Sequence, residues 1–298
     1  MTHAAIIGNG IAGISAARRL RVRQPDWTIT VISGESTHHY SRPALMYIFM
    51  GHMKYRDTKP YHDGFWRRER IDLVRDWVVN IDTANARLDL HRGGSMPYDR
   101  LLLAVGSKSN RFGWPGQDLE GVQGLYDLMD LHRLYHNVRG ARHAVIVGGG
   151  LIGIEMAEML HTRNIHVTFL VREKSYWNNV LPDAESALVN RYIEREGFDL
   201  RLNTELSEIL DDGRGRARAV VTSHGDELPA EIVGLTAGVS PNLDLVGDTD
   251  IATGRGILTD WSLRTNVPGV FAAGDCAEIV REGEARNLLQ QVWYTGGM

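Results

Sequence analysis

Residues 4–32 read AAIIGNGIAGISAARRLRVRQPDWTITVI, and their pattern is the most informative about the fold class. An apolar run leads into the glycine turn GNGIAG (residues 8–13), which is followed by a helical stretch and a β-branched run. This order predicts a βαβ unit with parallel strands. The first glycine permits the tight turn, the second lets a pyrophosphate approach the backbone, and the third lets the helix pack closely on the strand.

The helix that begins at this turn presents unpaired N–H groups and a partial positive charge, which together stabilise an anion by about 0.3–2 kcal/mol. Glu35 follows at about the 20-residue spacing at which a ribose-binding carboxylate is expected. A lone GxGxxG pattern also serves plain packing, so a structural turn is the alternative. Because the βαβ context is complete, we interpret the turn as a dinucleotide site.

The same pattern occurs a second time, in residues 144–171, which read AVIVGGGLIGIEMAEMLHTRNIHVTFLV. Such an internal repeat is a stronger signal than either turn alone. Two dinucleotide units in one chain indicate one tightly held cofactor and one exchanging partner. The pair that we expect is FAD with NAD(P)H.

Bulk composition limits the class of protein. The 298 residues suggest two domains, with 43% hydrophobic and 23% charged residues, as in a soluble globular protein. The net charge of −4 argues against bulk attraction to nucleic acid or an anionic membrane. The N-terminus lacks a basic signal-peptide region, and the apolar stretches are shorter than the roughly 20 residues of a membrane span. We therefore expect a cytoplasmic enzyme.

The order of elements predicts an α/β fold with two Rossmann-like domains, one binding FAD and one binding NAD(P)H. The FAD domain is expected to be discontinuous, with residues 1–110 and 238–298, and the NAD(P)H domain to comprise residues 111–237. Further strands and helices are predicted in five segments, namely strands at 101–105, 219–222 and 270–273 and helices at 126–137 and 184–196.

Four more motifs carry a resemblance to a known family. They are YSRPAL (40–45), YDRLLLAVGS (98–107), TAGVSPN (236–242) and TNVPGVFAAGD (265–275). Together with the first glycine turn, in this order, they resemble the pyridine nucleotide–disulfide oxidoreductase superfamily, and within it the rubredoxin/ferredoxin reductase and nitrite-reductase-like branch. The resemblance covers nearly the whole chain.

This resemblance implies roles for individual residues in FAD binding. Arg42 is expected to meet the FAD pyrophosphate, Pro43 to lie near the flavin, Asp275 to bind the ribityl chain, and Trp293 to lie beside the isoalloxazine. The FAD contacts expected from the motifs and the resemblance are Gly8, Gly10, Ile11, Ala12, Gly13, Glu35, Arg42, Pro43, Ala104, Val105, Gly106, Gly274, Asp275, Val292 and Trp293.

The second turn supplies the NAD(P)H contacts. Glu155, early in the following helix, is expected from the resemblance to contact the nicotinamide amide, and a solvated helix residue is the alternative. The full expected set is Gly148, Gly150, Leu151, Ile152, Gly153, Glu155, Arg172 and Gly238.

Cysteine usage narrows the activity. The single cysteine, Cys276, excludes an intrachain disulfide and a CxxC pair. Residues 41–46, where the disulfide reductases of the superfamily carry cysteines, contain none, so thiol chemistry at the flavin is disfavoured. Cys276 is expected to be a packed neighbour of the FAD site.

Tyr47 stands where rubredoxin-reductase-like sequences place a lysine near the flavin, so the usual lysine–glutamate pair with Glu155 cannot form. Pro43 and Tyr47 are predicted to form part of the flavin environment. No metal site is predicted, because His132 and His136, although spaced i, i+4, have no evident third ligand.

The nicotinamide preference is indicated at the end of the second βαβ unit. Val171 occupies the position that is usually acidic in NADH enzymes, while Arg172 occupies an arginine position of NADPH enzymes. Lys174 adds positive charge, whereas Glu173 weakens the case. We predict a preference for NADPH.

The chain ends soon after Asp275, whereas members of the family continue with a C-terminal interface domain. We therefore expect that domain to be absent here and the activity to be impaired. A homodimer is expected only if a missing C-terminal domain is present.

The predicted function is electron transfer from NAD(P)H via FAD to a small iron protein, rubredoxin or ferredoxin, or to a nitrite-reductase-type module. One alternative is an NAD(P)H oxidase or quinone reductase, and another is a redox-sensing flavoprotein of low turnover. The basic run RRER (67–70) either docks an acidic iron protein or is a solvated helix face.

Overall fold

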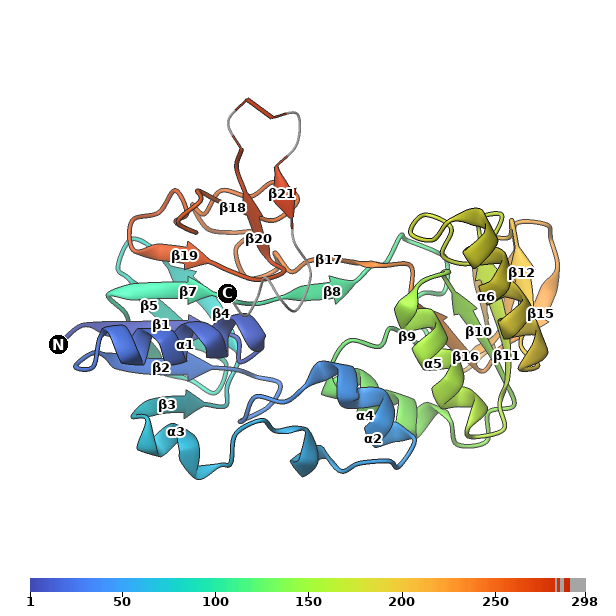
Figure 1. Cartoon of the computed structure of the whole chain (residues 1–298), viewed down its shortest axis with the longest axis horizontal. Helices are drawn as coiled ribbons and strands as arrows, with labels where there is room; N and C mark the ends of the chain where they lie inside the picture. The colour runs from blue at the N-terminus through green and yellow to red at the C-terminus, as the bar shows by residue number, and fades with distance from the viewer. Residues whose placement is uncertain (282, 285–286, 290–298) are drawn as a thin grey trace. The chain divides into compact units, whose positions relative to one another are not determined.

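The structure is a computed structural model that describes residues 1–281, 283–284 and 287–289. The chain divides into two compact units (Figure 1). The first unit contains Met1–Ser41, Tyr55–Lys108 and the described residues from Ser240 onward, and the second contains Arg42–Lys54 and Ser109–Val239.

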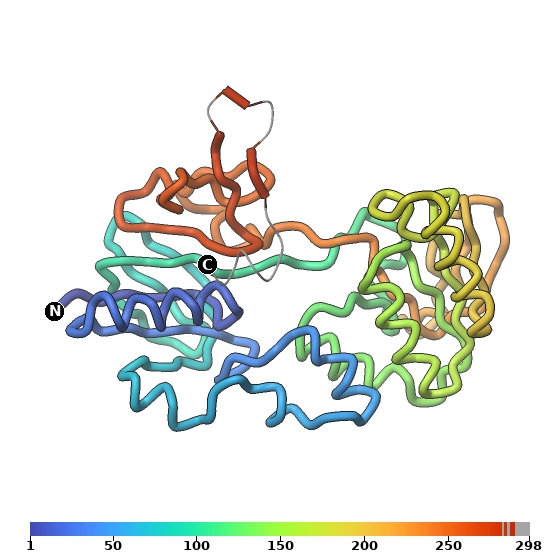
Figure 2. The backbone as a smooth tube through the Cα atoms, viewed as in Figure 1, coloured from blue at the N-terminus to red at the C-terminus, as the bar shows by residue number. Residues whose placement is uncertain are grey.

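The first unit is built on a five-stranded parallel sheet in the order β19-β7-β1-β2-β3. Its strands are β1 (His3–Ile7), β2 (Thr28–Ile32), β3 (Ile71–Val74), β7 (Arg100–Leu103) and β19 (Val270–Ala272). Helix α1 (Ile11–Arg23) connects β1 to β2, as the glycine turn predicts. The late strand β19 pairs with β7, so the chain returns to its first sheet and the domain is discontinuous, as predicted (Figure 2).

Both faces of this sheet are covered, which explains the nearly continuous apolar strands. Ile6 of β1 packs with Ile14 of α1 on one face. Its neighbours Ala5 and Ile7 pack with Leu101 of β7 on the other face. Alternate residues of one strand therefore belong to two different apolar clusters.

The second unit repeats this architecture with a sheet in the order β12-β11-β10-β16-β9. Its strands are β9 (Val122–Gln123), β10 (His143–Val147), β11 (His166–Val171), β12 (Asp199–Leu202) and β16 (Ile232–Leu235). Its longer helices are α4 (Leu128–Asn137), α5 (Leu151–His161) and α6 (Asp183–Arg195). Helix α5 begins at the second glycine turn. The two Rossmann-like units of the predicted fold class are therefore confirmed.

Smaller elements complete both units. Antiparallel sheets are formed by β4 (Val78–Asp82), β5 (Arg87–Leu90) and β6 (Ser95–Pro97) and by β13 (Leu206–Asp211), β14 (Ala217–Thr222) and β15 (Glu227–Pro229). The other strands are β8 (Ser107–Ser109), β17 (Val239–Pro241), β18 (Ile257–Thr259), β20 (Ala277–Ile279) and β21 (Leu288–Leu289). The short helices are α2 (Leu45–Phe49), α3 (Gly64–Arg68), η1 (Arg42–Ala44) and η2 (Tyr55–Thr58).

The segment 42–54 differs from the predicted domain boundaries, which count all of residues 1–110 with the first domain. In the structure this segment belongs to the second unit. Phe49 of α2 is fully buried, and its ring centroid lies 4.9 Å from that of Tyr135 on α4. The Tyr135 hydroxyl donates to the Ile48 carbonyl at 3.0 Å. Apolar burial against α4 therefore decides the placement, and the local sequence pattern does not reveal that contact.

Asp130, in the first turn of α4, is a buried carboxylate that accepts a hydrogen bond from the Tyr126 N–H at 2.8 Å. Burial, and secondarily the nearby Asp127, raises the pKa of Asp130 to about 6, while Arg133, 3.2 Å away, opposes the shift. The native chain therefore holds a proton that the unfolded chain releases at lower pH. As the pH rises from about 4 through about 6, this group is expected to reduce the free energy of unfolding by about 2–3 kcal/mol.

Substitution Asp130→Asn is expected to remove this slope of the free energy of unfolding against pH. The neutral amide does not ionise, and it keeps an acceptor oxygen for the Tyr126 N–H. Urea denaturation at a series of pH values measures the effect. Asp118→Asn is the control, since the Asp118 side chain is 80% exposed in the same unit. An unchanged slope in Asp130→Asn would show that Asp130 is not the titrating group.

Candidate dinucleotide-binding sites

The three glycine positions of the first turn differ in whether the packing requires glycine. Gly8 has φ +109°, and a Cβ there would lie 2.1 Å from the Ala104 carbonyl oxygen. A Cβ on Gly13 would lie 2.0 Å from the Gly8 carbonyl oxygen. Among the described residues, a Cβ on Gly10 would meet no atom within 4 Å. The fold therefore requires glycine at 8 and 13, whereas at 10 the space beside the backbone is open.

The open space beside Gly10 lies at the start of α1, where the helix N-terminus can bind an anion. Within the described chain, no side chain caps the helix at Gly10, and no acidic residue lies in its first turn, which contains the predicted contacts Ile11 and Ala12. The helix N-terminus therefore keeps its N–H groups and partial positive charge for an anion. These features fit the pyrophosphate of a dinucleotide such as FAD.

The loop after β2 is tied to the glycine turn by a residue that the sequence reasoning missed. Asn9, which is buried, donates from Nδ2 to the Ser36 carbonyl at 2.7 Å. Glu35 accepts a hydrogen bond from the Tyr40 hydroxyl. The predicted ribose carboxylate is thus held by a loop anchored to the turn. An asparagine inside a GxG motif, next to a polar loop, is the signal that could have indicated it.

The motifs at 98–107 and 265–275 meet the same turn at the carboxyl ends of β7 and β19. The Ser107 hydroxyl donates to Asp275 Oδ2 at 3.1 Å. A Cβ on Gly274, which has φ +79°, would lie 2.8 Å from the Cβ of Ala12. The segment Ala104, Val105 and Gly106 follows β7 directly. The structure therefore brings these expected FAD contacts together with the first turn in one unit.

The remaining expected FAD contacts are placed differently. Arg42 and Pro43 belong to the second unit, where Arg42 donates to the Tyr126 carbonyl at 3.0 Å. Val292 and Trp293 lie outside the described residues.

Cys276 is fully buried beside this site. Its Sγ lies 3.4 Å from the Leu103 carbonyl oxygen, and burial raises the pKa of the thiol to about 11. A thiol with this pKa is almost wholly protonated near neutrality and is a poor nucleophile. The geometry agrees with the expected packed neighbour.

In the second glycine turn, as in the first, close contacts surround the outer glycines of the motif, Gly148 and Gly153, and open space lies beside Gly150 among the described residues. Gly148 has φ +123°, and a Cβ there would lie 2.7 Å from the Thr236 carbonyl oxygen. A Cβ on Gly153 would approach the Thr236 hydroxyl to 3.0 Å. A Cβ on Gly150 would meet none of the described atoms within 4 Å. The buried Tyr176 fixes the turn by donating from its hydroxyl to the Gly150 carbonyl at 2.7 Å.

The helix after this turn carries Leu151, Ile152 and Glu155. Glu155 is half-buried, and burial, followed by repulsion from Glu158, raises the pKa of its carboxyl group. Gly238, with φ +85°, follows Ala237, whose carbonyl accepts from Asn110 Nδ2 at 3.1 Å.

Charged residues follow the end of β11. Val171, at the usual acidic position, is fully buried, so its side chain offers nothing to a ribose. Arg172 Nε lies 2.8 Å from Glu173 Oε1, and its side chain is 73% exposed. Lys174 Nζ lies 3.1 Å from Asp183 Oδ2. Both cations are therefore accessible but partly neutralised.

Tyr47, in α2, is half-exposed, and its ring lies edge-on to His52 with centroids 6.3 Å apart. No lysine stands at this position, as the sequence shows.

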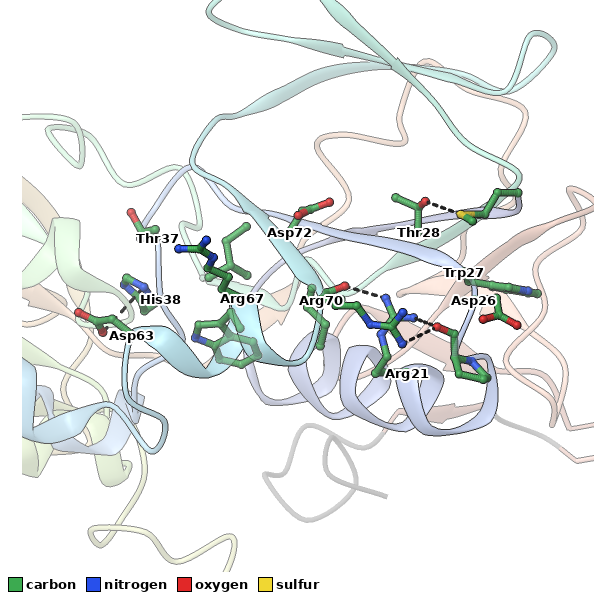
Figure 3. A pocket seen from close by; sticks show the side chains of 15 residues that line it. Arg21, Asp26, Trp27, Thr28, Thr37, His38, Asp63, Arg67, Arg70 and Asp72 are labelled. Atoms are coloured by element: carbon green, nitrogen blue, oxygen red, sulfur yellow. Dashed lines mark hydrogen bonds and ion pairs between the residues drawn. The ribbon is translucent and has the colours of Figure 1, made fainter.

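A separate cavity of about 630 Å³ lies in the first unit along α1, β3 and α3 (Figure 3). None of the expected FAD contacts that the structure describes lines it. Arg21, at its wall, donates to four backbone carbonyls, so its charge is already used within the fold. Arg67 and Arg70 line it together with three carboxylates, those of Asp26, Asp63 and Asp72. This mixture of charges does not favour the docking of an acidic partner at residues 67–70.

Among the described residues, no group of three or more His, Cys, Asp or Glu side chains is placed to hold a metal ion. His136 Nε2 lies 3.4 Å from Glu120 Oε1, which gives that histidine an ordinary surface partner. No described helix combines the length and apolar character needed to span a bilayer.

Comparison with known proteins agrees with this geometry. The pattern of the family described as pyridine nucleotide-disulphide oxidoreductase matches residues 2–293. The chain therefore belongs to this family of two-dinucleotide flavoprotein reductases.

Among its relatives is the ferredoxin–NAD(+) reductase component of a biphenyl dioxygenase system from Paraburkholderia xenovorans, with 33% identity over 95% of this chain and 70% of that one. A rubredoxin–NAD(+) reductase from Acinetobacter baylyi has 30% identity over 92% of this chain and 72% of that one. The crystal structure of a ferredoxin reductase from Rhodopseudomonas palustris superposes with a TM-score of 0.90 and 25% identity, over 100% of this chain and 74% of that one. The chain thus spans about seven-tenths of the length of these relatives.

Proposed function

We propose that the chain is an FAD-dependent NAD(P)H oxidoreductase that passes electrons to a small iron protein, a rubredoxin or ferredoxin, or to a nitrite-reductase-type module. One observation carries the proposal. Each unit contains a glycine, Gly10 or Gly150, that the packing of the described residues does not require and that leaves open space among them beside a helix N-terminus. A pyrophosphate explains both glycines, whereas a structural turn explains neither.

The first unit supplies the proposed FAD site. The turn at 8–13 would hold the pyrophosphate, Glu35 the adenosine ribose, and Asp275 the ribityl chain, with Ser107 orienting the Asp275 carboxylate. A flavin bound there would supply the chemistry of the reaction, namely hydride acceptance from a nicotinamide and electron transfer to an acceptor. The protein contributes position and electrostatics, and needs no acid or base for the transfer itself. Arg42, Pro43, Val292 and Trp293 remain predicted contacts of the same cofactor, and Tyr47 remains, with Pro43, part of the predicted flavin environment.

The second unit supplies the proposed NAD(P)H site, with the turn at 148–153 holding the pyrophosphate. Glu155 is proposed to accept a hydrogen bond from the nicotinamide amide. Its half-buried place on α5 supports this role over a solvated one, because burial limits the competition from water.

The nature of the acceptor is supported by chemistry and by the relatives. The single cysteine is buried and protonated near neutrality, so a dithiol does not mediate the transfer. The relatives include proteins named as reductases of ferredoxin and rubredoxin.

A cytoplasmic location also remains a prediction.

Anaerobic stopped-flow tests the acceptor. The FAD-loaded chain is reduced with NADPH or NADH and then mixed with ferredoxin, rubredoxin, a quinone or O₂. We expect reoxidation to be fastest with an iron protein. Faster turnover with O₂ or quinone would establish an oxidase or quinone reductase, and slow reduction with a long-lived charge-transfer complex would establish a redox sensor.

For the nicotinamide, we propose a preference for NADPH based on Arg172. The substitution Arg172→Ala is expected to reduce kcat/KM for NADPH by about tenfold, because one charge-assisted contact to the 2′-phosphate contributes about 1.5 kcal/mol. It should leave kcat/KM for NADH nearly unchanged. The ratio of the two values is the measurement.

Arg195→Ala is the matched control, because Arg195 is also 73% exposed and also pairs with the next residue, Glu196. A wild-type kcat/KM about tenfold higher for NADH than for NADPH would contradict the role of Arg172. Equal losses of kcat/KM for both nicotinamides in Arg172→Ala would contradict it as well.

A further inference from the structure

Trp77 lies against a glycine at the edge of the proposed FAD site. A Cβ built on Gly34 would lie 2.0 Å from Cδ2, 2.2 Å from Cε2 and 2.5 Å from Cγ of Trp77. All three atoms belong to the five-membered ring of the indole, so the ring lies face-on over the Gly34 backbone. The indole fills the space that any other side chain at position 34 would need.

The backbone around Trp77 is held in place. The buried Asp76 accepts the Trp77 N–H at Oδ1 (2.8 Å) and the Arg92 N–H at Oδ2 (3.3 Å). The Trp77 carbonyl accepts from the His91 N–H at 2.8 Å. The Trp77 backbone is therefore held in place, and the Gly34 backbone supports one face of the ring, so that the indole forms a platform.

One side of this platform is open. Trp77 is 54% exposed although Gly34 covers one face of its ring. Single exposed tryptophans are common on protein surfaces and need no explanation by themselves. Here, however, the close contact requires glycine at position 34. The exposed ring therefore has a defined position, next to the loop that follows β2.

That place is where the base of a bound dinucleotide is expected. Gly34 directly precedes Glu35, the proposed ribose carboxylate, in the loop that follows the carboxyl end of β2. Trp77 follows the carboxyl end of the neighbouring strand β3. Dinucleotides bind at the carboxyl ends of such strands, and the adenine is attached to the ribose that the carboxylate holds. A flat aromatic face beside Glu35 therefore suits a base that stacks.

We propose that Trp77 stacks on the adenine of bound FAD and that Gly34 is glycine because it supports the indole. The proposal rests on the proposed function, since it assigns a residue to the FAD site of the first unit.

The test is the dissociation constant of FAD for the deflavinated full chain, measured by calorimetry. Trp77→Ala is expected to raise this constant about 5- to 150-fold, the range found when a stacking aromatic is removed from a base. Trp77→Phe, which keeps an aromatic face, should retain most of the affinity. Trp261→Ala is the control, because Trp261 is 68% exposed in the same unit and should not affect the constant.

A second comparison separates stacking from a structural effect. The wild-type chain is expected to prefer FAD over a flavin dinucleotide that carries cytosine in place of adenine, and Trp77→Ala should lose that preference. Gly34→Ala should weaken FAD binding by displacing the ring, yet have no further effect in the Trp77→Ala background.

An unchanged dissociation constant in Trp77→Ala, or an unchanged preference for adenine, would overturn the assignment of Trp77 and leave the proposed function standing. Failure of the wild-type chain to bind FAD would instead overturn the proposed function itself. Thermal melts of each variant show whether a loss of affinity comes from unfolding.

Discussion

Substitution of Gly10 by valine is expected to abolish FAD binding while the fold stays intact. Among the described residues, no atom lies within 4 Å of a Cβ at position 10, so their packing is not disturbed. The same space is where a pyrophosphate would approach the start of α1. We expect the dissociation constant of FAD to rise by about 1,000-fold or more, which corresponds to about 4 kcal/mol. Calorimetry on the deflavinated chain measures it, and circular dichroism and thermal melting report on the fold.

Gly13→Ala provides the contrast. Its Cβ would lie 2.0 Å from the Gly8 carbonyl oxygen, so helix and turn must move apart. Overpacking of this kind costs about 1–3 kcal/mol of stability. The two variants therefore separate the glycine that serves the ligand from the glycine that serves the fold. Normal FAD affinity in Gly10→Val would mean that no pyrophosphate lies at this turn.

Gly150→Val is expected to have an effect of similar size on the other cofactor. A side chain at Gly150 would also meet open space, and the turn around it is fixed by Tyr176. The variant should therefore fold, bind FAD with wild-type affinity and keep its colour. Its affinity for NAD(P)H should fall by about 1,000-fold, because the pyrophosphate loses its approach to the backbone.

The measurement for Gly150→Val is the rate of anaerobic flavin reduction as a function of NADPH concentration. The control is Gly197→Ala, a left-handed glycine of the same unit that lies outside the turn. Loss of FAD from Gly150→Val, with NADPH affinity unchanged, would reverse the assignment of the two sites.

Much of this fold can be predicted from local patterns. The apolar runs beside the two glycine turns give the strands β1, β2, β10 and β11, because strands buried on both faces read as continuous apolar stretches. The antiparallel strands β4, β5 and β6 are short and partly polar, and they are not among the strands predicted from the sequence. The placement of residues 42–54 also depends on a distant contact, that of Phe49 with Tyr135, which local sequence does not encode.

The candidate sites show the same contrast. The glycine pattern predicts where a pyrophosphate is expected to bind, since each glycine has a local backbone reason. The motif assigns packing roles to Gly8 and Gly13 and a ligand role to Gly10. The distances agree with this division, because of the three only Gly10 has open space beside it among the described residues. The contact of Trp77 with Gly34 joins residues from two loops, so it becomes visible only once β2 and β3 are paired.

We propose that this one chain binds FAD and NAD(P)H together and moves hydride from the nicotinamide to the flavin. The most direct test is an anaerobic titration of the purified, FAD-reconstituted chain with NADPH, followed by the flavin absorbance. We expect one FAD per chain and loss of the oxidised flavin spectrum on addition of one equivalent of NADPH. A colourless protein that cannot be reconstituted with FAD, or a bound flavin that neither NADPH nor NADH reduces, would contradict the account.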